Sequence, residues 1–91
     1  MTSAPQPLEG ELSFARVPQL LQQAAALAQH GELDLARVSR ADSAGLALLL
    51  ELSRRAKAGG KTLRIRGAGE QVLRLARYFG LDSVLHFEPT S

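Results

Sequence analysis

The sequence predicts a single small α/β domain, in which a mostly parallel sheet of four strands, or of five, carries three helices mainly on one face. Two observations predict this class. Stretches with strand and helix spacing alternate along the 91 residues, ending in a short last strand, and this order is typical of parallel strands joined by crossover helices. Apolar and polar residues also alternate within each strand, whereas strands covered on both faces are continuously apolar. One face of the sheet is therefore expected to remain open to water.

The chain begins and ends in short stretches without a pattern. Residues 1–7, which contain two prolines, and residues 89–91 are expected to form tails, so the domain itself is expected at 8–88. The first strand is predicted at 8–14, at least as far as Leu12, because apolar and polar residues alternate there. Its expected inner residues are Leu8, Gly10, Leu12 and Phe14.

A helix and a second strand are predicted next. Pro18 suits the first turn of a helix, and leucines and alanines then recur at helical spacing until Gly31 ends the run. Residues 32–38 alternate again and predict a strand. A polar turn is expected at 39–42.

The clearest helix is predicted at 43–58, because its apolar residues form one stripe and its cations lie away from it. The stripe consists of Leu46, Leu49, Leu50 and Ala56. A Gly-Gly pair follows and is a typical helix end. Residues 62–66 predict a third strand, 70–79 a third helix that ends at a glycine, and 84–87 a short last strand.

Charged residues on the second and third strands are expected to meet on the open face. Glu32 and Asp34 point outward from one strand, and Arg64 and Arg66 point outward from the next. If the two strands are neighbours, these side chains pair, each pair contributing about 0.2–1 kcal/mol.

The charge distribution offers a nucleic-acid partner as one alternative. Residues 1–53 carry three basic and six acidic groups, a net charge of −3, whereas residues 54–91 carry eight basic and three acidic groups, a net charge of +5. The cations are spread over several elements, and the aromatic residues that RNA-binding surfaces place between them are missing. We therefore expect solvated faces and no nucleic-acid partner; retention on heparin that falls steeply with salt would indicate the opposite.

No motif of an enzyme or of a metal site is found. The chain has no cysteine, and His30 and His86 belong to no ligand or catalytic spacing. Residues 67–72 (GAGEQV) superficially resemble a dinucleotide-binding loop, but valine stands where the third glycine is needed. Gly67 and Gly69 are therefore interpreted as turn formers, and no catalytic residue, metal or cofactor is expected.

The chain is expected to be cytoplasmic. Its first twelve residues lack the basic start and apolar run of a signal peptide. The longest apolar stretch, Ala44–Leu50, is far shorter than the roughly 20 residues that cross a bilayer. We therefore expect no direct insertion into a membrane.

The most unusual local pattern lies where the polar turn meets the helix at 43–58. Asp42 is a favourable N-cap, since its carboxylate accepts hydrogen bonds from first-turn amides. Ser43 then falls at the positive end of the helix dipole. Gly45 costs about 0.5–1 kcal/mol relative to Ala inside a helix, which indicates close approach of another backbone. That backbone belongs either to this protein's own sheet or to a partner.

The stretch Val38–Leu50 (VSRADSAGLALLL) resembles the central motif of STAS domains, the fold of anti-sigma-factor antagonists and of some transporter regulators. The resemblance extends to Gly10–Leu12, Ala56–Lys61 and Leu75–Leu81, and covers nearly all of the chain after Leu8. It is closest to the branch of small cytoplasmic STAS subunits in phospholipid-transport ABC complexes of Gram-negative bacteria. The hydroxyl residue matching Ser43 is usually Thr in that branch, so this chain keeps the hydroxyl and lacks a methyl group.

This resemblance implies a non-enzymatic regulatory or assembly subunit that binds the ABC ATPase subunit and, through it, the permease, peripheral to the inner membrane. It implies a docking surface at the start of the helix at 43–58. The expected contact residues are Arg40, Asp42, Ser43, Ala44, Gly45, Leu46, Ala47, Glu51 and Arg54. The alternative is an anti-sigma-factor antagonist, in which an anti-sigma-factor kinase phosphorylates Ser43, the candidate phosphoacceptor, and the phosphorylation releases the partner.

Overall fold

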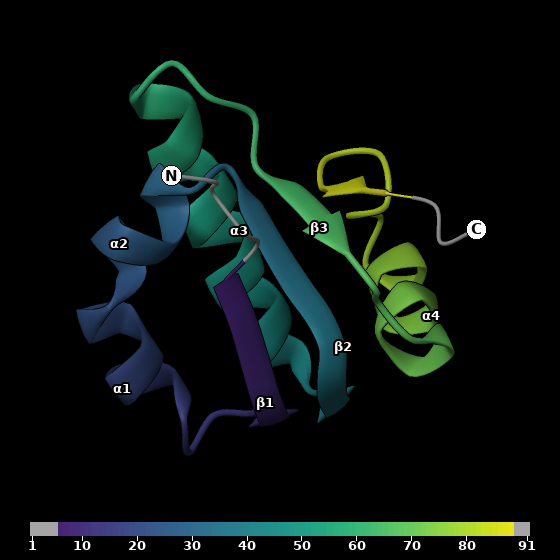
Figure 1. Cartoon of the computed structure of the whole chain (residues 1–91). Coiled ribbons are helices and arrows are strands. Elements are labelled where there is room, and N and C mark those ends of the chain that lie inside the picture. Colours follow the sequence, from purple (N-terminus) through teal and green to yellow (C-terminus); the bar gives the residue numbers. More distant parts are fainter. Residues whose placement is uncertain (1–5, 89–91) are drawn as a thin grey trace.

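The computed structural model describes residues 6–88, which form a four-stranded, all-parallel sheet and four helices (Figure 1). The elements in chain order are β1 (Gln6–Leu12), α1 (Val17–Gln22), α2 (Ala24–Gln29), β2 (Glu32–Ala41), α3 (Ser43–Ala58), β3 (Arg64–Arg66), α4 (Glu70–Tyr78) and β4 (His86–Phe87). Residues 1–5 and 89–91 of the expected tails lie outside the described residues. The other two expected tail residues, at 6 and 7, open β1.

The strands lie in the sheet in the same order as in the chain, β1-β2-β3-β4. The parallel α/β class predicted from the alternation is confirmed. β2 is longer than the predicted strand at 32–38 and takes in most of the predicted turn. It continues because β1 runs beside it to the end, where Leu12 is the register partner of Ala41.

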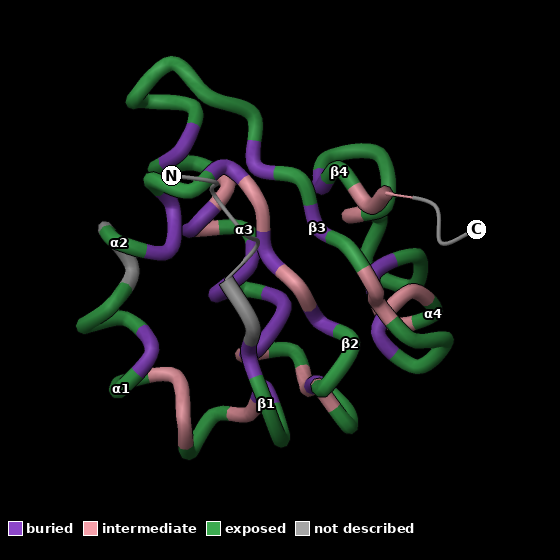
Figure 2. Tube along the Cα trace, viewed as in Figure 1, coloured by how far each residue is buried: buried purple, intermediate pink, exposed green. Residues whose placement is uncertain are grey.

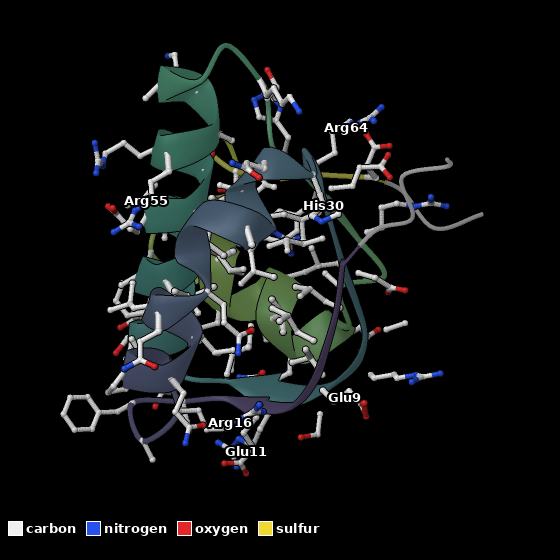
Figure 3. All side chains as sticks on the ribbon, turned by 60° about the vertical axis from the view of Figure 1, so that its left-hand side comes forward. Glu9, Glu11, Arg16, His30, Arg55 and Arg64 are labelled. Carbon is white, nitrogen blue, oxygen red and sulfur yellow. The ribbon has the colours of Figure 1, made fainter. Side chains whose placement is uncertain are left out.

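One face of the sheet is covered by helices and the other is open, as predicted. Along β2, Leu33 and Leu35 are buried, whereas Arg64 on β3 is exposed. Glu32 and Arg64 are register partners and form an ion pair of 2.7 Å, which confirms the expected charge pairing at this position. In Figure 3, the labelled Arg64 and Glu9 project away from the helices.

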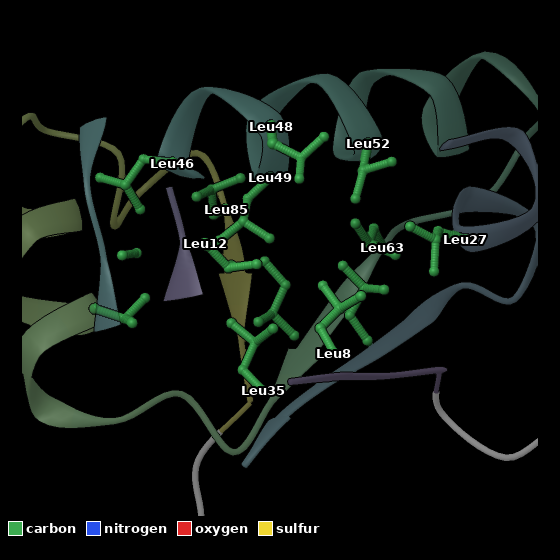
Figure 4. Close-up of a cluster of buried hydrophobic side chains, with 14 of the residues drawn as sticks. Leu8, Leu12, Leu27, Leu35, Leu46, Leu48, Leu49, Leu52, Leu63 and Leu85 are labelled. Carbon is green, nitrogen blue, oxygen red and sulfur yellow. The ribbon is translucent and has the colours of Figure 1, made fainter. Parts of the chain in front are cut away.

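A single apolar core lies between the sheet and the helices. Buried segments of the strands and of α3 face one another in Figure 2, and the close-up in Figure 4 shows leucines filling the space between them. Leu12, Leu49 and Leu52 are completely buried. The stripe predicted for α3 therefore packs as expected, except that Leu50 stays 38% exposed.

The structure has four helices where three were predicted, because the first predicted helix is divided into α1 and α2. The segment breaks at Gln23, whose N–H donates to the carbonyl of Leu20, three residues back, at 3.0 Å. This tighter turn ends α1 and restarts the chain as α2, so that both Leu20 and Leu27 reach the core. Neither glycine nor proline marks the break.

Two of the four inner residues predicted for the first strand are exposed. Gly10 has a positive φ of 78° beside an irregularity in the β1–β2 register, which disturbs the alternation. Phe14 lies beyond the end of β1 and is 79% exposed. β3 and β4 are also shorter than the predicted strands at 62–66 and 84–87, and α4 ends one residue before 79.

Candidate docking site at the start of helix α3

The turn from β2 into α3 is held by the carboxylate of Asp42. The N–H of Gly45 donates to Oδ1 at 2.9 Å and caps the helix, as the sequence predicted. The N–H of Phe14 donates to Oδ2 at 3.0 Å and attaches the loop after β1 to the same residue. These hydrogen bonds, that of Phe14 first, lower the pKa of Asp42 because they stabilise the charged form.

Gly45 is explained by this protein's own sheet. A Cβ atom at this position would lie 2.1 Å from the carbonyl oxygen of Leu12, closer than any real contact. The same carbonyl accepts a hydrogen bond from the N–H of Asp42 at 3.0 Å. The start of α3 therefore lies directly against the end of β1, and Gly45 is the residue that permits it.

Gln71 also holds the turn, and sequence analysis did not identify it. Its side-chain oxygen accepts from the N–H of Ala41, and its side-chain nitrogen donates to the carbonyl of Ala41, both at 2.8 Å. A carboxamide offers one donor and one acceptor, as a peptide group does. Gln71, from α4, thus pairs with the backbone of β2 at Ala41, seven residues beyond Asp34, where the β2–β3 register ends.

The nine predicted contact residues divide into a buried group, an exposed group and a group at the margins. Gly45 and Leu46 are buried, so their part is to position the turn. Ser43 and Ala47 are exposed at the start of α3, and Ala44 and Asp42 are partly exposed between them. The remaining predicted residues lie at the margins of this surface, Arg40 at the end of β2 and Glu51 and Arg54 in the middle of α3.

Glu51 and Arg54 form one cluster with Arg55. The two oxygens of Glu51 accept from Arg54 at 2.9 and 2.8 Å, and one of them also accepts from Arg55 at 2.7 Å. Hydrogen bonds from Arg54 and then from Arg55 lower the pKa of Glu51 to about 2. One carboxylate facing two guanidinium groups leaves this cluster with a net charge of +1.

An apolar groove lies beside the exposed start of α3, and the sequence analysis did not predict it. Its floor includes Ala44, Ala47 and Leu48 of α3, and Glu51 and Arg55 continue it along the same helix. Its other wall consists of Phe14, Val17 and Leu21. The sequence contained one clue to this groove: Phe14 lies two residues beyond Leu12, the end of β1, so its side chain need not enter the core.

The other residues considered in the sequence do not form a site. Gly67 turns the chain after β3 with a φ of 72°, and a Cβ there would meet the N–H of Ala36. Among residues 6–88, no three His, Asp or Glu side chains come together in a way that would hold a metal ion. Within the same residues, no helix combines the length and apolarity that crossing a bilayer requires.

Two solved structures share this fold. A candidate anti-sigma factor antagonist from Thermotoga maritima matches 92% of this chain and 78% of its own, with a TM-score of 0.79 and 18% identity. The anti-sigma factor antagonist SpoIIAA in its unphosphorylated form matches 93% of this chain and 77% of its own, with a TM-score of 0.65 and 21% identity. The fold of this chain is therefore the one that these two antagonists share.

The family follows from the sequence match. The family model described as "Mlab, STAS domain" matches residues 7–86, so the chain belongs to this STAS domain family. It is similar to the intermembrane phospholipid transport system binding protein MlaB of Escherichia coli (strain K12) and of Shigella flexneri. In each case it is 45% identical over 51 residues, 56% of this chain and 53% of the relative. The match spans about half the length of these curated relatives.

Proposed function

We propose that this chain is a non-enzymatic regulatory and assembly subunit of an ABC transporter for phospholipids, in a Mla pathway that maintains outer-membrane lipid asymmetry. It binds the cytoplasmic ATPase subunit and, through it, the permease. Membership of the MlaB family and the names of the relatives support this role. The chain then works in the cytoplasm, peripheral to the inner membrane, and performs no chemistry of its own.

The observation that carries the proposal is the rigidly held start of α3. Asp42 and Gly45 attach it to the end of β1 and to the loop that follows, and Gln71 attaches it to α4. The surface that this framework presents consists of small side chains at Ser43, Ala44 and Ala47. Small, preorganised surfaces let a partner approach closely without a loss of conformational entropy on binding.

Ser43→Glu tests this surface. Glutamate in the first turn is favourable for the helix dipole, so the variant is expected to fold. Its bulk and charge beside Asp42 are expected to weaken binding to the purified ATPase subunit at least tenfold. Titration calorimetry measures the affinity, and circular dichroism checks the fold. Ser83→Glu, an exposed serine in the turn before β4, is the matched control. Wild-type affinity of a folded Ser43→Glu protein would remove Ser43 from the interface.

The exposed hydroxyl of Ser43 favours a second function, that of an anti-sigma-factor antagonist switched by phosphorylation. A phosphate there would add about two negative charges beside Asp42 and repel a docked partner. Incubation with ATP and the cognate anti-sigma-factor kinase, followed by mass spectrometry, separates the two functions. A phosphate on Ser43 indicates the antagonist, and an unmodified chain that binds the ABC ATPase indicates the transporter subunit.

A further inference from the structure

We propose that the groove between α1 and α3 receives an apolar side chain from a helix of the ATPase subunit, and that a carboxylate on the same helix pairs with Arg55 and Arg54. This inference rests on the proposed function and identifies the element of the partner that binds. It adds a second wall to the interface, formed by the loop after β1 and by α1. None of the nine predicted contact residues belongs to this wall.

The groove is joined to the docking turn through Asp42. One oxygen of this carboxylate holds the start of α3, and the other holds the backbone of Phe14, so the two walls are fixed to each other at one end. Ala44 and Ala47 belong both to the predicted surface and to the groove. A partner that covers Ser43 therefore also covers the mouth of the groove.

The apolar wall is left open to water by the rest of the described chain. Phe14 is 79% exposed and Leu21 is 39% exposed. Water contacts these side chains in the free protein, so covering them with a matching apolar group is favourable. Small side chains at Ala44 and Ala47, beside the larger Phe14 and Leu21, leave room for an apolar side chain of a partner helix.

The positive charge at the far end of the groove indicates that the partner carries a negative charge there. Both oxygens of Glu51 are already occupied by Arg54 and Arg55, and the cluster keeps a net charge of +1. Arg55 lines the groove itself. A carboxylate on the partner would therefore be complementary to this end of the groove.

The apolar half of the proposal is tested by Phe14→Ala. The hydrogen bond to Asp42 uses the backbone of Phe14 and is retained, so the variant is expected to fold and to bind the purified ATPase subunit at least tenfold more weakly. The matched control is Tyr78→Ala, since Tyr78 is an aromatic of equal exposure (81%) on α4; its affinity is expected to stay within twofold. Ala47→Trp, which fills the groove, is expected to weaken binding likewise, with Ala58→Trp at the end of the same helix as its control.

The charged half is tested by Arg55→Glu. Its control is Arg74→Glu, because Arg74 also pairs with a glutamate four residues before it, Glu70 on α4. Arg55→Glu is expected to reduce the affinity about tenfold at low salt and by less as salt screens the pair. Equal effects of the two substitutions would show that only the overall charge of the chain matters and would overturn this half.

The outcomes separate this inference from the proposed function. If Ser43→Glu abolishes binding while Phe14→Ala and Ala47→Trp bind as the wild type does, the groove is not used and the proposed function stands. If the Phe14 and Ala47 variants alone lose affinity, the groove is confirmed and Ser43 is not in the interface. Light scattering could instead show that the wild type is a dimer and that Phe14→Ala is a monomer with unchanged affinity for the ATPase subunit. That result would show that a second copy of this chain occupies the groove. No binding by the wild type would overturn both proposals.

Discussion

Helices α3 and α4 both begin where a parallel strand ends, yet their first turns are built differently. At α3 the N-cap is Asp42, whose side chain accepts from the first turn. At α4 the N-cap is Gly69, whose position has an extended backbone and no side-chain cap. A Cβ atom at Gly45 would collide with the Leu12 carbonyl, whereas one at Gly69 would meet nothing within 4 Å.

This difference shows that close backbone contacts fix the start of α3, whereas side chains such as Gln71 hold the start of α4. The start of α3 contacts β1, the loop after β1 and α4, so few of its atoms can move independently. α4 contributes to this through Gln71, in the second position of its own first turn. Two glycines precede α4, at positions 67 and 69, and only one lies in the first turn of α3. The closest approach to another backbone is nevertheless at that single glycine, Gly45, which lies against Leu12.

The most direct test of this difference is to add one methyl group at the start of each helix, by a glycine-to-alanine substitution. Gly45→Ala is expected to destabilise the fold by about 3 kcal/mol or more, because the colliding atom is backbone and moves only with β1. Gly69→Ala is expected to change the free energy of unfolding by less than about 1 kcal/mol, since the space is open and φ is −78°. Urea denaturation measures both. Equal losses would show that the two starts are held alike.

The sequence predicted the α3 region well because its signals are local. An acidic N-cap, a leucine stripe and a terminal Gly-Gly pair lie within 20 residues, and they fixed the bounds of α3 at 43–58. The pairing of Glu32 with Arg64 was also predictable, since alternation sets the faces and chain order sets the neighbours. Asp42 was identified as a cap because it directly precedes the predicted helix, which is again a local signal.

What the sequence could not predict depends on contacts between distant segments. The hydrogen bonds of Gln71 join residues 30 positions apart and follow no periodicity. The backbone of Phe14 reaches Asp42 across 28 positions, and its side chain was placed inside the sheet because the strand was extended past its end. The break at Gln23 carries no glycine or proline, and the two helices that it separates both pack on α3.

The second-largest expected effect concerns Asp42, the N-cap of α3. Asp42→Ala is expected to cost about 1–2 kcal/mol at pH 7, because the amides of Gly45 and Phe14 lose their acceptor. Gly69→Asp, which gives α4 the cap it lacks, is expected to gain only a few tenths of a kcal/mol. Chemical denaturation of both variants sharpens the comparison, and a gain at α4 as large as the loss at α3 would contradict it.

The contribution of Asp42 is also expected to depend on pH in one direction. Its pKa is lower in the folded protein, so the unfolded chain binds the proton more tightly. The stabilisation is therefore complete above the unfolded pKa of about 3.9 and is lost as the pH falls through the folded value. The difference in stability between wild type and Asp42→Ala is expected to shrink below about pH 4. An unchanged difference at pH 3 would show that charge plays no part.

The smallest expected effect tests whether α4 braces the start of α3. Gln71→Ala removes two hydrogen bonds to Ala41 and is expected to cost about 1 kcal/mol. Arg74→Ala, one turn further along α4, is the control, since its ion pair with Glu70 is exposed and long at 3.6 Å. Hydrogen exchange gives the local readout: the amide of Ala41 is expected to exchange faster only in the Gln71 variant. If its protection is unchanged, β1 and the loop after it hold the turn without α4, and the rigidity of the docking surface owes nothing to that helix.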